Sequence, residues 1–123
     1  DARGNGFFLM VEGSQIDYQG HGNNTQGVVN EMLDFDRAIK IALDFAERDG
    51  ETLVVITADH ETGGMTIMNG SYSDKTIEAQ FNTEGHTGTM VPIYSFGPQA
   101  DKFTGIMENT KIPLLIKETL ELQ

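Results

Sequence analysis

A ten-residue segment, residues 12–21, places the strongest constraint on what this chain can form. It follows a continuous apolar run at residues 7–11 and contains three potential metal ligands, Glu12, Asp17 and His21. A continuous apolar run is typical of a strand covered on both faces, so these ligands are expected where a buried strand ends. Asp17 and His21 are four residues apart, and a helical backbone would bring both side chains to one face. A carboxylate and an imidazole held together suit zinc, provided that other ligands converge on them.

The overall composition narrows the possible partners. The chain has 123 residues, which is one domain at most and enough for a core. Its formal net charge of −11 argues against nucleic acid or an anionic membrane surface as partner. The same charge disfavours a phosphate-type substrate unless bound cations reverse the local sign, although acidic excess also serves solubility. The absence of cysteine excludes disulfides and thiolate metal sites, and no apolar run approaches the roughly 20 residues of a membrane span.

The apolar pattern predicts a βαβ unit in the first half of the chain. Residues 7–11 and 53–56 are expected to be buried strands, and glycines between residues 13 and 22 indicate a loop broken by short turns. Apolar residues then recur at intervals of three and four, which predicts an amphipathic helix that starts near Gln26 and ends at Asp49 and Gly50. A strand, a helix and a second strand after a short return favour parallel strands with a right-handed crossover.

The second half of the chain predicts more strands and one helix. Strands are expected at residues 65–68, 77–81 and 90–96, and Pro92 should limit the pairing of the last one. A final helix is expected over residues 113–122. The predicted fold class is therefore α/β, a partial mixed sheet with a parallel βαβ core and helices packed on it. Ligands in such sheets gather at the carboxyl ends of strands, where Glu12, Asp59 and His60 all fall.

Three histidines are the only ones in the chain, and all lie in glycine-rich loops beside predicted strand ends: His21, His60 and His86. A single histidine is usually structural or exposed, but three placed alike favour a shared site. A catalytic zinc takes three protein ligands, and Asp17, His21 and His86 supply that number. Asp59 and His60 offer two ligands for a second ion.

Glu12 is a hard oxygen ligand that suits Mg²⁺. Two metal ions about 4 Å apart stabilise the attacking and leaving oxygens of a phosphoryl transfer, so the set predicts such a site with two zinc ions and one magnesium ion. The carboxylates of Glu12, Asp17 and Asp59 could instead cap loops. We interpret Glu61 as an ordinary loop residue.

Three motifs resemble the alkaline phosphatase family. The family's magnesium-and-zinc stretch is similar to residues 11–24, Val-Glu-Gly-Ser-Gln-Ile-Asp-Tyr-Gln-Gly-His-Gly-Asn-Asn. Its second-zinc motif is similar to residues 57–64, Thr-Ala-Asp-His-Glu-Thr-Gly-Gly. The segment that returns a histidine to its first zinc is similar to residues 85–88, Gly-His-Thr-Gly. The resemblance implies a first zinc on Asp17, His21 and His86, a second on Asp59 and His60, and magnesium on Glu12. It also implies hydrolysis of small phosphate monoesters through a phosphoserine, in a periplasmic or secreted protein.

The nucleophile of the family has no counterpart here. The family carries its nucleophilic serine in an N-terminal half, and Ser14, Ser71, Ser73 and Ser95 do not match its surroundings. We therefore expect residues 1–123 to be the C-terminal portion of a catalytic domain, without catalytic residues of its own and inactive alone. We expect weak zinc binding at Asp17, His21 and His86, with the second-zinc and magnesium sites empty or partly filled. Unpaired strand edges and apolar faces would favour a homo-oligomer.

Two other interpretations remain open from the sequence. One is a different enzyme of the same superfamily, such as a phosphomutase or phosphodiesterase, since the Thr-Ala-Asp-His motif is shared. The Glu12 that leads into Asp17 and His21 favours the phosphatase. The other is a metal-binding module without catalysis, which a start codon just before residue 1 would support. An upstream Asp-Ser-Ala motif in the same reading frame would support the enzyme instead.

Overall fold

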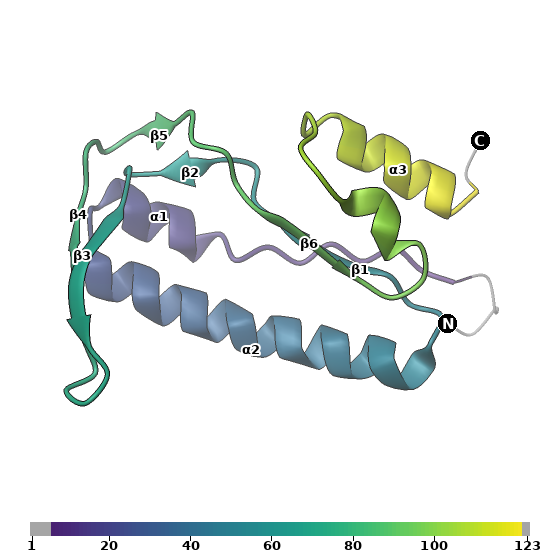
Figure 1. Cartoon of the computed structure of the whole chain (residues 1–123), viewed down its shortest axis with the longest axis horizontal. Coiled ribbons are helices and arrows are strands. Elements are labelled where there is room, and N and C mark those ends of the chain that lie inside the picture. Colours follow the sequence, from purple (N-terminus) through teal and green to yellow (C-terminus); the bar gives the residue numbers. More distant parts are fainter. Residues whose placement is uncertain (1–5, 122–123) are drawn as a thin grey trace.

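The structure is a computed structural model, and it describes residues 6–121. Its helices are α1 (Gln15–His21), α2 (Thr25–Asp49) and α3 (Lys111–Thr119), with a 3₁₀ helix η1 (Ala100–Phe103). Its strands are β1 (Val54–Thr57), β2 (Glu61–Thr62), β3 (Thr66–Ser71), β4 (Thr76–Gln80), β5 (His86–Thr87) and β6 (Ile93–Phe96). The β3–β4 hairpin lies at one end of α2, and α3 and η1 lie toward the other end (Figure 1).

Helix α2 is the longest element and confirms the predicted amphipathic helix. The Asn24 side chain accepts a hydrogen bond from the Gly27 amide at 3.1 Å, so it caps the first turn. At the other end Gly50 has a φ of 73°, a left-handed conformation that glycine adopts without a steric cost. Its amide donates to the Ala46 carbonyl at 2.9 Å and closes the helix.

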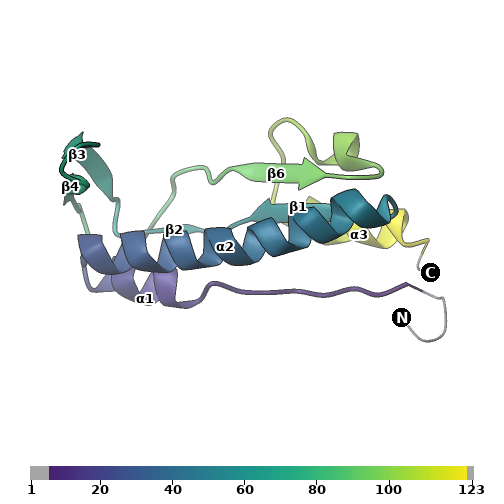
Figure 2. The same ribbon diagram turned by 90° about the horizontal axis from the view of Figure 1, so that it is seen from below.

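The described strands form three separate antiparallel pairs, β1 with β6, β2 with β5, and β3 with β4. The predicted parallel pairing of residues 7–11 with residues 53–56 is not present among them. Residues 7–11 are extended but are not assigned as a strand, and their side chains are well exposed, Met10 by 79%. This segment runs roughly along α2 in both views, and the Phe7 ring meets the Phe45 ring with centroids 6.2 Å apart (Figures 1 and 2). An apolar run gives a strand only where a neighbour supplies backbone partners.

Helix α1 replaces the loop that the glycines suggested. Gly20 is buried within this helix, and a Cβ built on it would lie 3.0 Å from both Cβ and Cγ2 of Thr62 in β2. The missing side chain therefore lets α1 pack directly against β2. Glycine is a poor helix former, so this close packing, rather than propensity, favours the helical conformation here.

The other predicted elements form with shifted ends. β3 extends three residues beyond the predicted strand, and β6 begins only at Ile93, directly after Pro92. Helix α3 begins at Lys111, so Pro113 lies in its first turn as expected. The predicted end of this helix at residue 122 lies outside the described residues. Strands β2 and β5 were not predicted, because two-residue strands carry no periodic signal.

The buried core is small. Among the described residues, Ala46 and Phe103 are the apolar side chains with exposures of only 2% and 1%. Many large apolar side chains are exposed, including Leu9 by 71% and Ile41 by 72%. Exposed apolar surface on this scale is typical of surfaces that contact other protein. None of the described helices combines the length and hydropathy that a membrane crossing requires.

Candidate metal centre

Two side chains of α1 and one of β5 meet beside the β2–β5 pair. His21 Nε2 lies 3.2 Å from His86 Nε2. Asp17 Oδ1 lies 3.4 Å from His21 Nε2 and 3.6 Å from His86 Nε2. The segment is helical rather than the predicted loop, and the spacing of four residues therefore places Asp17 and His21 on one face of α1. The structure thus brings together three residues that span 69 positions of the sequence, in the combination that the sequence indicated.

The spacing of these three atoms fits a tetrahedral ion. Zinc binds histidine nitrogen and carboxylate oxygen at about 2.0–2.1 Å, so two ligand atoms of a tetrahedron are about 3.3–3.4 Å apart. The three separations of 3.2, 3.4 and 3.6 Å lie around that value. An ion pair between Asp17 and a protonated histidine is the simpler use of such a cluster. The two Nε2 atoms at 3.2 Å can share one N–H···N hydrogen bond without a metal, whereas two unprotonated Nε2 atoms at this distance suit a shared ion.

A hydrogen bond at His21 Nδ1 determines the tautomer of this ring, and it leaves Nε2 facing the cluster with a lone pair. His21 Nδ1 lies 2.5 Å from the backbone carbonyl oxygen of Glu84. A carbonyl oxygen only accepts, so Nδ1 carries the proton and donates it. In the neutral ring Nε2 is then unprotonated, which is the state a metal requires. The ring orientation and its donor atom are set before any ion binds.

His60 lies against this cluster without joining it. Its ring stacks on that of His86, with centroids 3.5 Å apart and planes inclined by 20°. Asp59 Oδ2 lies 3.4 Å from His60 Nε2, but the Asp59 side chain is 86% exposed. Glu12 is exposed in the extended segment before α1. Within residues 6–121, the one group of three or more ligand residues close enough to share an ion is Asp17, His21 and His86, and Glu12, Asp59 and His60 are not part of it.

Thr62 contacts the cluster, and the sequence interpretation did not single it out. Its hydroxyl donates to Asp17 Oδ1 at 2.6 Å and lies 3.2 Å from His60 Nδ1. The hydrogen bond from Thr62 is the main cause that lowers the pKa of Asp17 below its ordinary value. Partial burial opposes this shift, and the charges of the nearby histidines add to it, His21 first. The only sequence signal for Thr62 was its position two residues after His60, on the same face of an extended backbone.

Glu61 holds the neighbouring turn in place. Its carboxylate accepts from the amides of Gly64 at 3.1 Å and Met65 at 3.3 Å, and from the Thr87 hydroxyl. This side chain therefore links β2, the turn that follows it and β5 next to His86. The structure places Glu61 in a strand rather than a loop, and its role is structural.

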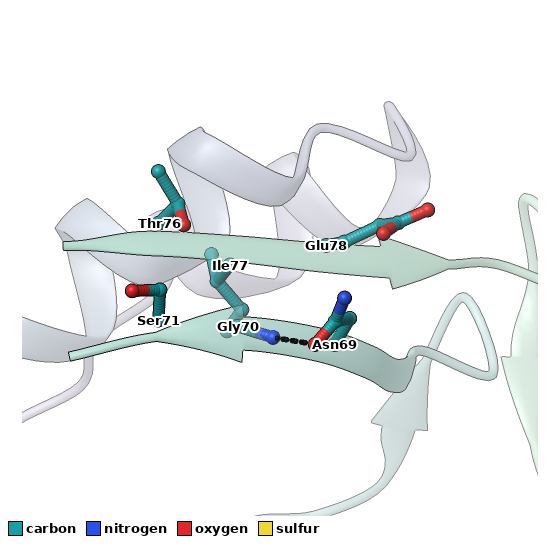
Figure 3. Close-up of a pocket in the computed structure, with 6 residues that line it drawn as sticks. All are labelled: Asn69, Gly70, Ser71, Thr76, Ile77 and Glu78. Carbon is teal, nitrogen blue, oxygen red and sulfur yellow. Dashed lines mark hydrogen bonds between the residues drawn. The ribbon is translucent and has the colours of Figure 1, made fainter. Parts of the chain in front are cut away.

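Two hollows lie away from the metal ligands. One is lined by residues of the β3–β4 hairpin, where the Gly70 amide donates to the Asn69 side chain at 2.8 Å (Figure 3). The other is mostly apolar and lies between α2 and the hairpin, with Met32, Leu33 and Ile67 among its lining residues. No predicted ligand lines either hollow, so the chemistry of the described residues lies with the exposed cluster instead.

Comparisons with known proteins agree with the motifs. A family model described as alkaline phosphatase matches residues 1–80 and 67–122. Alkaline phosphatase 3 of Bacillus subtilis is 33% identical over 94% of this chain, and alkaline phosphatase H of Pseudomonas aeruginosa is 38% identical over 97% of it. The solved structure of alkaline phosphatase from the Antarctic bacterium TAB5 is similar over 95% of the chain, with 43% identity and a TM-score of 0.87.

The likeness covers only part of each relative. The chain spans 40% of the Bacillus protein, 28% of the Pseudomonas protein and 36% of the TAB5 chain. A TAB5 mutant, His 135 Asp, described as having Mg bound in the M3 site, is similar to the same extent, with 42% identity and a TM-score of 0.87. These similarities confirm the predicted fold class, a partial α/β domain of this kind, although the sheet pairs observed within it are antiparallel.

Proposed function

The chain belongs to the alkaline phosphatase family, and we propose that it supplies most of the metal ligands of a phosphomonoesterase. One observation carries the proposal. The donor atoms of Asp17, His21 and His86, on α1 and β5, meet at separations suited to one tetrahedral ion. Structural similarity over 95% of the chain to a phosphatase of the same family supports it.

The proposed ligand sets follow the motifs. Asp17, His21 and His86 would hold a first zinc, Asp59 and His60 a second zinc, and Glu12 a magnesium ion. When bound, such ions polarise phosphoryl oxygens and lower the pKa of a coordinated hydroxyl or water. The chain's own residues place the donor atoms: α1 aligns Asp17 and His21, and the carbonyl of Glu84 holds the His21 ring. The Mg-bound relative supports metal use by this family.

The substrate and the rest of the site complete the proposal. The substrates would be small phosphate monoesters, and the positive charge of the ions would offset the acidity of the chain. Residues 1–123 would form the C-terminal portion of the catalytic domain, and the nucleophilic serine would come from outside this chain. The chain alone would then be inactive, with its second-zinc and magnesium sites empty or partly filled. The parent protein would be periplasmic or secreted.

We also propose that the chain associates with copies of itself. Exposed apolar side chains on the segment 7–11 and on α2 support this. Light scattering at high protein concentration tests it. Dimers or larger species are expected, and a clean monomer at high concentration would count against the proposal.

Zinc calorimetry and hydrolysis of an aryl phosphate test the function. The full-length gene product should bind zinc and hydrolyse the ester, and His86→Ala should lose most of both. Asp36→Ala removes an exposed carboxylate of α2 and should change neither. Unchanged zinc affinity in His86→Ala would exclude the proposed first site. Ester hydrolysis by residues 1–123 alone, free of other protein, would exclude an external nucleophile.

A further inference from the structure

Thr62 is in contact with two of the proposed ligand sets. Its hydroxyl is 2.6 Å from Asp17 of the first set and 3.2 Å from His60 of the second. Its backbone pairs with that of His86 in the β2–β5 ladder. Its Cβ and Cγ2 face Gly20 of α1, where there is no room for another carbon atom. The side chain is therefore held from several sides, and its hydroxyl has little freedom to turn away.

The chemistry of one hydroxyl decides how these contacts are arranged. A threonine hydroxyl has a single proton to donate and lone pairs with which to accept. That proton goes to the Asp17 carboxylate, which only accepts. The contact with His60 must then run the other way, with Nδ1–H of His60 donating to the Thr62 oxygen. In the neutral ring this leaves Nε2 of His60 unprotonated.

We propose that Thr62 is a positioning residue that selects the His60 tautomer with a free Nε2 and holds the Asp17 carboxylate. It would prepare one ligand of each zinc set through a single hydroxyl. This inference deepens the proposed function and rests on it, because the value of a free Nε2 lies in binding an ion. Partners of this kind orient metal-bound histidines and raise metal affinity.

The tautomer of His60 can be measured without any metal. Nitrogen NMR of ¹⁵N-histidine-labelled, metal-free full-length protein distinguishes a protonated Nδ1 from a protonated Nε2. The wild type and Thr62→Ser, which keeps the hydroxyl, should both show His60 protonated at Nδ1. Thr62→Val, which keeps the shape without the hydroxyl, should show a mixture or a shift toward protonated Nε2. A wild-type His60 protonated at Nε2 would overturn the proposal, whether or not the valine variant folds.

Zinc affinity provides the second measurement. Competition with a chelator should show about a 10- to 100-fold loss of affinity in Thr62→Val and little change in Thr62→Ser. Thr104→Val is the matched control, since the Thr104 hydroxyl donates to the Asp101 carbonyl at 2.9 Å at the end of η1. Its zinc affinity should equal that of the wild type. A wild type that binds zinc, with Thr62→Val unchanged in both affinity and tautomer, would refute the role of Thr62 alone. A wild type that binds no zinc yet shows the expected tautomers would refute the proposed function instead.

Discussion

Replacing Gly20 by alanine sets helix propensity against packing. In an exposed helix the change favours the helix by about 1 kcal/mol, because glycine has the higher conformational entropy when unfolded. In α1 the new Cβ would lie 3.0 Å from two carbon atoms of Thr62 and 3.2 Å from its carbonyl oxygen. Carbon atoms prefer about 3.5–4.0 Å, so α1 and Thr62 would have to separate by a few tenths of an ångström.

The expected balance is a modest loss of stability and a larger loss of metal binding. Overpacking of this kind costs about 1–3 kcal/mol, which the propensity gain offsets in part, so Gly20→Ala should lower the unfolding free energy by about 0–2 kcal/mol. The shift of α1 carries Asp17 and His21 away from His86. We expect a zinc affinity about tenfold lower, since a few tenths of an ångström is a large part of the accuracy of about 0.5 Å that ligand constellations need.

Urea unfolding and chelator competition on the full-length protein measure the two effects separately. Gly22→Ala is the matched control, because a Cβ there meets its nearest neighbour, the Tyr18 carbonyl oxygen, at an ordinary 3.5 Å. It should leave zinc affinity unchanged. If Gly20→Ala were more stable than the wild type and bound zinc equally well, the close packing of α1 on β2 would not control the ligand geometry.

Three further substitutions test single contacts. Glu61→Ala should lower the unfolding free energy by about 1–3 kcal/mol, measured by urea unfolding, because two amides and the Thr87 hydroxyl lose their acceptor. Lys102→Met should raise the pKa of Glu118, because the hydrogen bond from Lys102 and then its charge hold that pKa below 4.5. The stabilisation by this pair is present above the pKa of Glu118 in the unfolded chain and is lost as the pH falls through its pKa in the folded chain. An NMR titration of the carboxyl group that finds no difference between the variant and the wild type would contradict this prediction. Gly50→Ala should lower the unfolding free energy by about 1 kcal/mol, measured by urea unfolding. The φ of 73° at this position is unfavourable for alanine, although no atom lies within 4 Å of the added Cβ.

The long elements could be predicted from the sequence because their signals are local. The apolar spacing and the capping residues Asn24 and Gly50 locate α2 almost to the residue. Helix α1 could not be predicted in this way, because it depends on the contact of Gly20 with Thr62, which is 42 positions away in sequence. The apolar run at 7–11 is ambiguous for the same reason: sequence shows that a segment can be a strand but does not show its partner.

The ligand cluster could be predicted in part. The spacing of Asp17 and His21 and the similar placement of the three histidines, His86 among them, indicated a shared site, and the family motifs implied the same set. The hydrogen bonds that orient these ligands could not be predicted, since a threonine hydroxyl and a backbone carbonyl have no distinctive sequence pattern. Glu12 and Asp59 did not join the cluster, and their assignment to metal stays a prediction.

His21 and His86 lie 65 residues apart in sequence, yet their ring nitrogens are 3.2 Å apart. An ion held between them would act as a removable cross-link. An ion that binds only the folded chain stabilises it by mass action, by about 2.7 kcal/mol when the free ion is at about 100 times its Kd. With so little apolar surface buried inside the described residues, the metal supply would set how long the chain survives proteases. Loss of the ion would then shorten the lifetime of the folded chain.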